Sequence, residues 1–196
     1  MERFLTHTGT IAVINEDNVD TDRIIPARFL SRVSRSGYGE LLFADVRKDD
    51  FPLDQPAAQG ASVLVMGTNF GCGSSREHAV WAIQQAGYKA VIAKKTATSE
   101  AYSDIFRQNS ANCGLLLIEL EGKVHDALVA AGSGATVTIN LPDQTVTLDG
   151  NAYKFDINLG TKEALVAGLD LIGTTLIYKG QIEAFEKDDT SFVPTR

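Results

Sequence analysis

The chain has 196 residues, of which 44% are hydrophobic and 22% are charged, and its net charge is −7. This composition is typical of a globular protein with a substantial core, and the acidic balance argues against a general nucleic-acid-binding role. No run of 18 apolar residues is present, which excludes a membrane-spanning helix, and residues 1–7 lack the apolar core of a signal peptide. We therefore expect a cytoplasmic protein.

The predicted elements alternate between strands and helices before an antiparallel region. Apolar, β-branched runs predict strands at 10–14, 62–66, 91–93 and 115–120, and helices are predicted at 75–87, 98–109 and 123–131. Ser74 and Glu77 match a capping box that would begin the first of these helices, and Gly87 would end it. Period-two alternation predicts a meander of strands at 136–140, 144–148 and 152–157, followed by helices at 161–169 and 174–187.

This order of elements predicts a three-layer α/β domain with a mixed sheet. We expect one domain over residues 1–187, containing an irregular loop region at 28–60. The polar residues 188–196 are predicted to form a flexible C-terminal tail.

The cysteine and histidine content limits the metal chemistry of this chain. It has two cysteines, Cys72 and Cys113, and three histidines without metal-ligand spacing. This excludes a disulfide framework and also a cysteine-ligated iron–sulfur cluster or zinc site built from this chain alone. If metal chemistry occurs here, the metal must therefore come from elsewhere.

Residues 67–78, which we call the elbow, are glycine-rich and join a predicted strand to a predicted helix. Glycines let the backbone approach a ligand, and the N–H groups at a helix N-terminus favour an anion. Arg76 adds a planar fork suited to a carboxylate or phosphate, and Ser74 and Ser75 add hydroxyls. The pattern is not that of a P-loop, a dinucleotide fingerprint or a hydrolase elbow. The alternative is a capped helix after a tight turn, and we interpret Cys72 as a packing residue rather than a reactive thiolate.

An arginine-rich segment precedes the elbow in the chain. Four of the nine arginines lie within 13 residues that contain no acid, namely Arg23, Arg28, Arg32 and Arg35. Such a concentration suits a di- or tricarboxylate, and the alternative is a basic loop that pairs with acids on a partner. Residues 20–22, Asp-Thr-Asp, form either a turn or a group that orients an arginine or serine.

Two further interpretations concern the predicted helices. Asp104 and Arg107 are three residues apart on one helix face, which predicts a surface ion pair. Trp81 and Tyr102 are predicted to be core residues on helices.

Two long motifs resemble those of a known family. Residues 18–30 (NVDTDRIIPARFL) and 69–79 (NFGCGSSREHA) are similar to motifs of the isopropylmalate dehydratase small-subunit family, within the aconitase superfamily. Residues 103–109 and 168–176 also resemble this family, so the similarity covers nearly the whole chain in order. The resemblance implies the swivelling β/β/α domain of aconitases and a separate large subunit that holds a 4Fe–4S cluster. The implied reaction interconverts 2-isopropylmalate and 3-isopropylmalate through isopropylmaleate in leucine biosynthesis.

The resemblance also implies roles for particular residues. Ser74 matches the serine that removes the proton from carbon, and the implied catalytic positions are Ser74, Arg76 and Asp22, with Asp22 acting through its neighbours. The implied substrate-binding positions are Ser75, Gly73, Thr21 and one of Arg32 and Arg35, and no metal ligand is implied in this chain.

Two alternatives to this function remain. Small subunits of homoaconitate, citraconate or methylmalate hydratases share the same elbow, and a non-catalytic carboxylate-binding module would also explain the elbow and the arginines. The expected partners are a cluster-bearing large subunit, in a heterodimer or heterotetramer, and a small hydroxy-dicarboxylate. Neither nucleic acid nor a membrane is expected as a partner.

Overall fold

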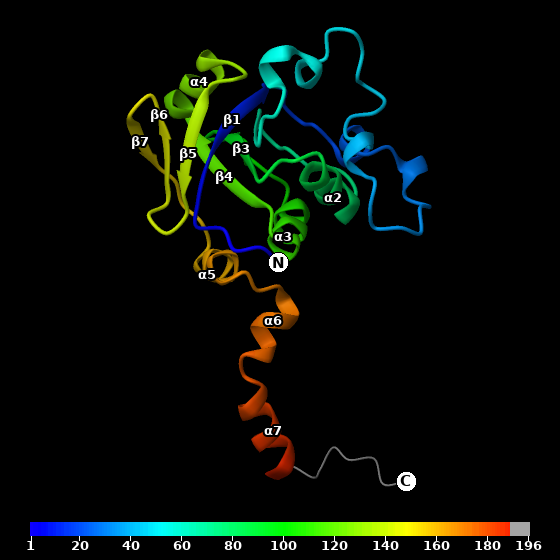
Figure 1. Cartoon of the computed structure of the whole chain (residues 1–196), viewed down its shortest axis with the longest axis vertical. Coiled ribbons are helices and arrows are strands. Elements are labelled where there is room, and N and C mark those ends of the chain that lie inside the picture. The colour runs from blue at the N-terminus through cyan, green and yellow to red at the C-terminus, as the bar shows by residue number, and fades with distance from the viewer. Residues whose placement is uncertain (189–196) are drawn as a thin grey trace.

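The computed structural model describes residues 1–188 (Figure 1). The predicted tail at 188–196 lies, apart from its first residue, outside the described residues. The strands are β1 (Thr6–Ile14), β2 (Val63–Met66), β3 (Ala90–Lys95), β4 (Leu116–Glu121), β5 (Thr136–Asn140), β6 (Thr145–Leu148) and β7 (Asn151–Lys154). The helices are α1 (Thr21–Ile24), α2 (Glu77–Gln85), α3 (Asp104–Cys113), α4 (Gly122–Ala131), α5 (Leu159–Ala167), α6 (Leu171–Leu176) and α7 (Lys179–Asp188).

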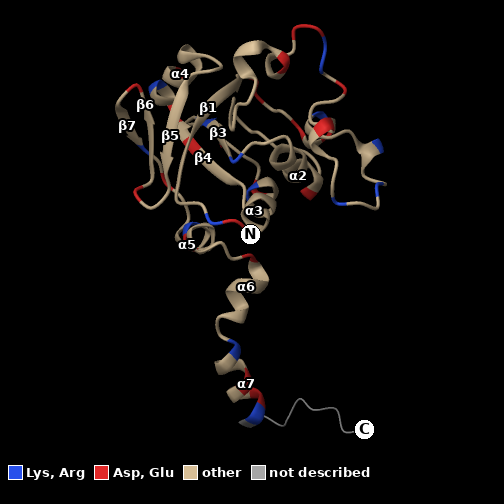
Figure 2. Cartoon of the chain, viewed as in Figure 1, with Lys and Arg blue, Asp and Glu red and all other residues tan. Residues whose placement is uncertain are grey.

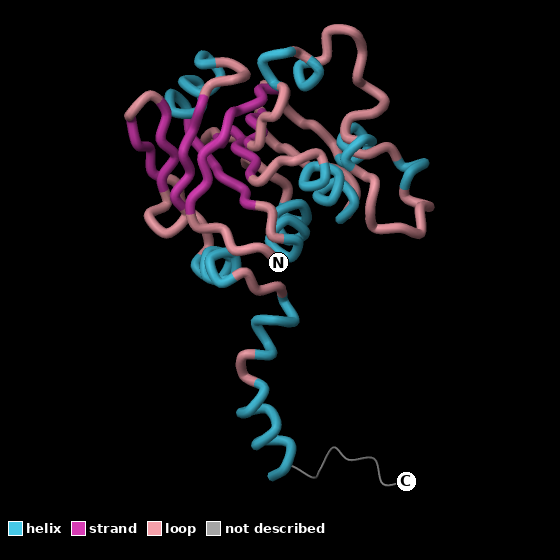
Figure 3. The backbone as a smooth tube through the Cα atoms, in the orientation of Figure 1, coloured by secondary structure: helices cyan, strands magenta, loops and turns pink. Residues whose placement is uncertain are grey.

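One mixed sheet organises the fold. Its seven strands lie in the order β4-β3-β2-β1-β5-β6-β7, with β1 to β4 parallel and β5 to β7 forming an antiparallel meander. β1 serves both halves, because residues 11–14 pair with β2 whereas residues 6–10 pair with β5. β1 therefore changes its pairing partner along its length, and the sheet curls, with helices around it (Figure 3).

Two apolar clusters lie on opposite faces of the parallel half. Alternation along β2 sends Val63 and Val65 to one cluster and Leu64 and Met66 to the other. The first cluster also contains residues of β5 and β6, so it fills the space between the two halves of the curled sheet. The second cluster packs the outer face against α2 and α3. This arrangement confirms the predicted α/β fold with a mixed sheet and its β, β and α layers.

The carboxyl ends of β1, β2 and β3 lie at the same edge of the sheet, since these strands are parallel. The segments that follow them, residues 15–24, 67–76 and 96–103, therefore meet at that edge. Ligands of open α/β sheets are commonly bound there.

The predicted helix at 98–109 is wrong at its start. α3 begins only at Asp104, where the Ser103 side chain caps it by accepting a hydrogen bond from the Phe106 N–H. Residues 99–103 instead run along the elbow, and Tyr102 lies in this segment rather than on a helix. Tertiary hydrogen bonds to the elbow hold these residues extended, which local periodicity could not reveal.

The predicted helix at 174–187 is also wrong, because it is two short helices, α6 and α7. Asp170 caps α6 by accepting from the Gly173 N–H, and α6 ends at Leu176. Its glycine and two threonines are weak helix formers, which explains the early end. The first two strands of the meander and α4 lie within one residue of their predicted bounds, whereas β7 ends at Lys154 rather than at residue 157.

α6 and α7 extend away from the body of the molecule (Figure 1). Six large apolar residues of this arm are more than half exposed: Leu171, Ile172, Leu176, Ile177, Tyr178 and Phe185. Within residues 1–188, no helix has the length and apolar character needed to cross a membrane. The domain boundary at 187 stays a prediction.

Candidate functional site

The elbow is held from one side by the segment that follows β1. The Gly71 N–H donates to the Val19 carbonyl at 2.8 Å, and the Thr21 N–H donates to the Cys72 carbonyl at 2.9 Å. These bonds make residues 15–24 a close neighbour of the elbow. The two motifs of the sequence thus form a single structural unit.

Glycine is required at position 71 for two reasons. Its φ is +73°, a left-handed conformation that disfavours other residues, and a Cβ there would lie 2.3 Å from Cγ of Phe106. The elbow can therefore pack directly onto α3. Gly73 also has a positive φ, +91°, and is exposed at the turn that leads to the two serines.

The predicted capping box is wrong. α2 begins at Glu77, its N-cap is Arg76, and no side chain caps it. The Glu77 carboxylate instead accepts from Nε1 of Trp81 at 3.0 Å. Tertiary contacts hold Ser74 outside the helix, because Thr21 Oγ1 donates to its carbonyl at 3.1 Å and accepts from its N–H at 3.2 Å. The exposed Ser74 hydroxyl is therefore not used by the helix.

Asp22 and Arg76 form an ion pair at 2.5 Å. The Arg76 side chain is 14% exposed, whereas that of Asp22 is 54% exposed. The neighbouring guanidinium lowers the pKa of Asp22, so this carboxylate stays charged at neutral pH. The structure thus brings together three predicted site residues, Ser74, Arg76 and Asp22, with Thr21 tying their two segments to each other. Ser75 is exposed beside them.

The arginine-rich segment divides into paired and available arginines. Arg23 forms an ion pair with Glu16, and Arg28 with Asp45. Arg32 donates to the Gly37 carbonyl at 3.1 Å, and the Arg35 guanidinium lies 5.2 Å from the centre of the Trp81 ring. Neither Arg32 nor Arg35 has an acidic partner among residues 1–188. The basic residues of this loop are seen at the side of the molecule (Figure 2).

The segment of Arg35 is attached to α2. Nε2 of Gln85 donates to the Arg35 carbonyl at 2.8 Å, and Oε1 of Gln85 accepts from the Tyr38 N–H at 2.8 Å. The His78 ring packs against the rings of Tyr38 and Trp81, with distances between ring centres of 5.4 and 4.7 Å. Because α2 begins at the end of the elbow, these contacts attach the loop that carries Arg35 to the helix that follows Ser74.

Sequence reasoning missed the role of residues 99–103. The Phe70 N–H donates to the Ala101 carbonyl at 2.9 Å, so this segment borders the elbow opposite residues 15–24. The signal for it was Ser103 followed by Asp104, a capping residue and a first-turn acid that mark the true start of α3. The predicted ion pair between Asp104 and Arg107 is wrong, since Arg107 pairs with Glu100 and Glu119.

Comparison with known proteins decides the family. Residues 1–123 match the Aconitase C-terminal domain family, and residues 127–158 match the LeuD family, described as LeuD_N. The chain is 47% identical to the 3-isopropylmalate dehydratase small subunit of Corynebacterium jeikeium, covering 99% of this chain and 97% of that protein. It is 46% identical to the subunit of the same name from Streptomyces griseus, covering 99% and 98%.

The chain belongs to the 3-isopropylmalate dehydratase small-subunit family. A crystal structure of a 3-isopropylmalate dehydratase (leuD) from Methanocaldococcus jannaschii shares the fold, with a TM-score of 0.67 and 30% identity. That match covers 93% of this chain and 99% of the other. The resemblance found in the two motifs is thereby confirmed, and this member of the small-subunit family has a large subunit as its implied partner.

The surroundings of both cysteine thiols disfavour the thiolate form. Burial raises the pKa of Cys72, and nearby Asp20 raises it further. Burial and the Glu77 carboxylate raise the pKa of Cys113 to about 11. Among residues 1–188, no three His, Cys, Asp or Glu side chains gather in a way that could hold a metal ion. Residues of the elbow line none of four cavities of about 180–340 Å³ within the described part of the chain.

Proposed function

We propose that this chain, together with a large subunit, interconverts 2-isopropylmalate and 3-isopropylmalate through isopropylmaleate in the cytoplasmic leucine pathway. The observation that carries this proposal is the Ser74 hydroxyl. Ser74 is exposed, does not cap the helix, and is followed two residues later by Arg76, whose side chain is largely buried. The names of the relatives support the choice of reaction.

Ser74 is the proposed base. Its oxygen takes the proton from the substrate carbon, and it returns a proton when water is added back in the other orientation. A serine alkoxide is unfavourable in water, but a guanidinium and the free N–H groups at the start of α2 would stabilise it in a closed site. Ser74 and Ser75 are exposed in this chain, so the large subunit must supply the closure. We therefore expect no turnover by this chain alone.

The substrate carries two carboxylates, and the chain offers groups that suit them. Arg76, the Ser75 hydroxyl and the backbone at Gly73 would bind one carboxylate at the N-terminus of α2. Arg32 or Arg35, the two arginines without acidic partners, would bind the other. Thr21 and Asp22 keep Ser74 and Arg76 in place for this contact.

A 4Fe–4S cluster on the large subunit would supply a Lewis acid for the departing hydroxyl. The residues of this chain do not fit such a cluster, because Cys72 lies in the elbow and Cys113 at the end of α3, and a cluster needs three or four thiolate ligands. The proposed role of this chain is therefore limited to the base and the carboxylate contacts.

The arginine loop also bears on the choice among related substrates. Val33, between the two available arginines, is fully exposed. An apolar side chain at this point suits the isopropyl group of the proposed substrate. Together with the names of the relatives, this supports the isopropylmalate reaction over the homoaconitate one.

The test is ultraviolet absorbance of the unsaturated intermediate formed from 2-isopropylmalate. The chain is mixed anaerobically with the cluster-loaded large subunit, and each chain alone is the control. Turnover in the mixture alone is the expected result. Absence of turnover with an intact cluster and a stable complex would contradict the proposal, and citramalate and homocitrate would then be tested as substrates.

A further inference from the structure

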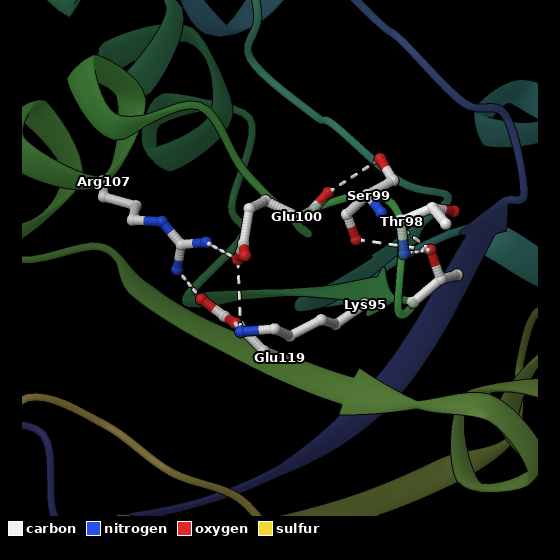
Figure 4. A network of polar contacts seen from close by, with 7 residues as sticks. Lys95, Thr98, Ser99, Glu100, Arg107 and Glu119 are labelled. Carbon is white, nitrogen blue, oxygen red and sulfur yellow. Dashed lines mark hydrogen bonds and ion pairs between the residues drawn. The ribbon is translucent and has the colours of Figure 1, made fainter.

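Four charged side chains, Lys95, Glu100, Arg107 and Glu119, form a network of ion pairs (Figure 4). Arg107, on α3, uses one guanidinium nitrogen for Glu100 at 3.2 Å and another for Glu119 on β4. Lys95, at the end of β3, bridges the same two carboxylates at 3.2 and 3.4 Å. Two elements of the fold, β3 through Lys95 and α3 through Arg107, thus hold Glu100, which lies in the segment that connects them.

The backbone of that segment contacts the elbow. The Glu100 carbonyl accepts a hydrogen bond from the Asn69 N–H at 2.8 Å, and the next carbonyl, that of Ala101, accepts from the Phe70 N–H at 2.9 Å. Glu100 therefore binds the network through its carboxylate and the elbow through its carbonyl. A shift of the Glu100 side chain would therefore move the Glu100 carbonyl, which accepts the hydrogen bond from the elbow.

The other end of the segment is fixed by α3 itself. Ser103 Oγ donates to the Gly71 carbonyl at 2.6 Å. The Arg107 guanidinium also lies 5.5 Å from the centre of the Tyr102 ring, and the buried Tyr102 hydroxyl donates to the Val91 carbonyl at 2.7 Å. Arg107 thus contacts the segment at two places, on both sides of Ala101.

The effect of the network is expected to be local. The Arg107 and Glu100 side chains are 31% and 62% exposed, and ion pairs with this exposure contribute little to global stability. The elbow, by contrast, has no long helix or strand of its own to fix it. Its N–H groups at Asn69 and Phe70 depend on carbonyls of the segment that Arg107 holds.

We propose that Arg107 is a positioning residue, which fixes residues 99–103 and through them the elbow that carries Ser74. It touches neither substrate nor the reacting atoms. The consequence for catalysis rests on the proposed function of Ser74. The consequence for the backbone of the elbow does not, and it can be measured without any substrate.

The first test is amide hydrogen exchange in the free full-length chain, read by NMR at Asn69 and Phe70. Arg107→Gln removes both ion pairs, and Glu100→Gln weakens the same contact from its other side. We expect exchange at the two amides to be at least tenfold faster in Arg107→Gln, with a smaller increase in Glu100→Gln. The matched control is Lys94→Gln, which removes an ion pair of the adjacent β3 residue with Asp126 on α4. Unchanged exchange in Arg107→Gln, or an equal increase in Lys94→Gln, would overturn the proposal.

The second test is steady-state turnover of the complex with the large subunit. A displaced base lowers kcat, so Arg107→Gln should reduce kcat about tenfold while KM changes less than threefold, and Lys94→Gln should change neither. Faster exchange with unchanged kcat would refute the catalytic part of the inference. If the wild-type complex does not turn over 2-isopropylmalate, the proposed function fails, and the exchange experiment alone decides whether Arg107 positions the elbow.

Discussion

Asp22 lies on α1 and Arg76 lies at the N-cap of α2, and their ion pair joins the two segments. An arginine that is mostly buried needs an anion nearby, since an unpaired charge is costly to bury. Asp22 supplies one anion and leaves the planar fork able to bind a second, such as a substrate carboxylate. Ser74 is kept beside this pair by both hydrogen bonds of Thr21 Oγ1.

Replacement of the proposed base, Ser74, should remove activity without harm to the fold. Ser74→Ala should lower kcat about 10²–10⁴-fold, the range for loss of a general base. Binding to the large subunit should be unchanged, because the Ser74 hydroxyl takes no part in the capping of α2. The measurement is kcat, with size-exclusion chromatography of the complex as the control. Normal turnover by a correctly assembled complex would show that Ser74 is not the base.

Arg76→Lys keeps the charge but removes the fork. A point charge cannot bind Asp22 and a carboxylate in the same planar geometry, so KM for 2-isopropylmalate should rise about tenfold, or ~1.4 kcal/mol of binding free energy. The control is Arg23→Lys, a change on α1 at an arginine that pairs with Glu16 outside the elbow. Equal values of KM in the two variants would argue against a carboxylate contact by Arg76.

His125 should make the stability of the chain depend on pH. It is fully buried on α4, and its Nε2–H donates to the Met66 carbonyl at 2.7 Å. Burial lowers its pKa below 6.5, and nearby Lys94 lowers it further. These effects outweigh those of the Met66 hydrogen bond and Asp126, which raise it. The unfolded chain then binds a proton at higher pH than the folded chain. The free energy of unfolding should therefore fall as pH drops below about 6.5, by up to ~1.4 kcal/mol per pH unit for this proton.

The check is urea denaturation of the wild type and His125→Gln between pH 7.5 and 5. Glutamine keeps a donor for the Met66 carbonyl but does not titrate, so the variant should lose less stability over this range. His7, whose pKa burial also lowers, stays in both proteins and contributes equally to both slopes. Parallel slopes would mean that His125 is not the group responsible.

At the scale of elements, the elbow is a loop that depends on its neighbours for its shape. One side binds residues 15–24, the other binds residues 99–103, and the glycine at its centre packs on α3. A helix or strand satisfies its own backbone groups, whereas this loop satisfies them through other segments. Its geometry is therefore a property of three connections at one edge of the sheet.

Gly71→Ala should be strongly destabilising. The new Cβ would overlap the Phe106 ring and would be strained at a φ of +73°, which together predict a loss of about 2–4 kcal/mol in the free energy of unfolding. Gly60→Ala is the matched control, because its φ is +72° and a Cβ there meets no atom within 4 Å. It should cost only the backbone strain, about 1–2 kcal/mol. Equal losses in chemical denaturation would show that contact with Phe106 is unimportant.

At the scale of the whole molecule, the sheet and its two apolar clusters form the body, and the α6–α7 arm extends from it (Figure 1). The N-terminal segment binds the chain just before the arm begins. The Met1 amino group donates to the Gly168 carbonyl at 3.1 Å, and the Phe4 N–H donates to the Leu165 carbonyl at 2.9 Å. Beyond this point, the large apolar residues of the arm face solvent rather than the body.

Deletion of all residues after Leu169 should therefore leave the body intact. The arm buries little apolar surface, so its loss should change the free energy of unfolding by less than about 1 kcal/mol and Tm by less than about 4 °C. Calorimetry of the shortened and full-length chains measures this directly. A reduction of Tm by more than about 10 °C would mean that the arm supports the core.

The sequence by itself determined the features that depend on local patterns. Buried β-branched runs predicted the strands, turn residues predicted the meander, and the two motifs identified the family. It also brought Ser74, Arg76 and Asp22 forward as site residues, because each lies in a motif that is distinctive in the sequence alone. The physical reason is that strand burial and turn conformation follow from a few adjacent side chains.

Only the tertiary structure decided what each polar residue pairs with. Ser74 fits a helix cap in the sequence, but bonds to Thr21 hold it outside α2. Four arginines looked equivalent, yet Glu16 and Asp45 neutralise two of them. Arg107 pairs with Glu100, in the segment before α3, and with Glu119 on β4, rather than with Asp104 on its own helix. Such partners are brought together by sheet topology across long stretches of chain, and no local periodicity encodes that proximity.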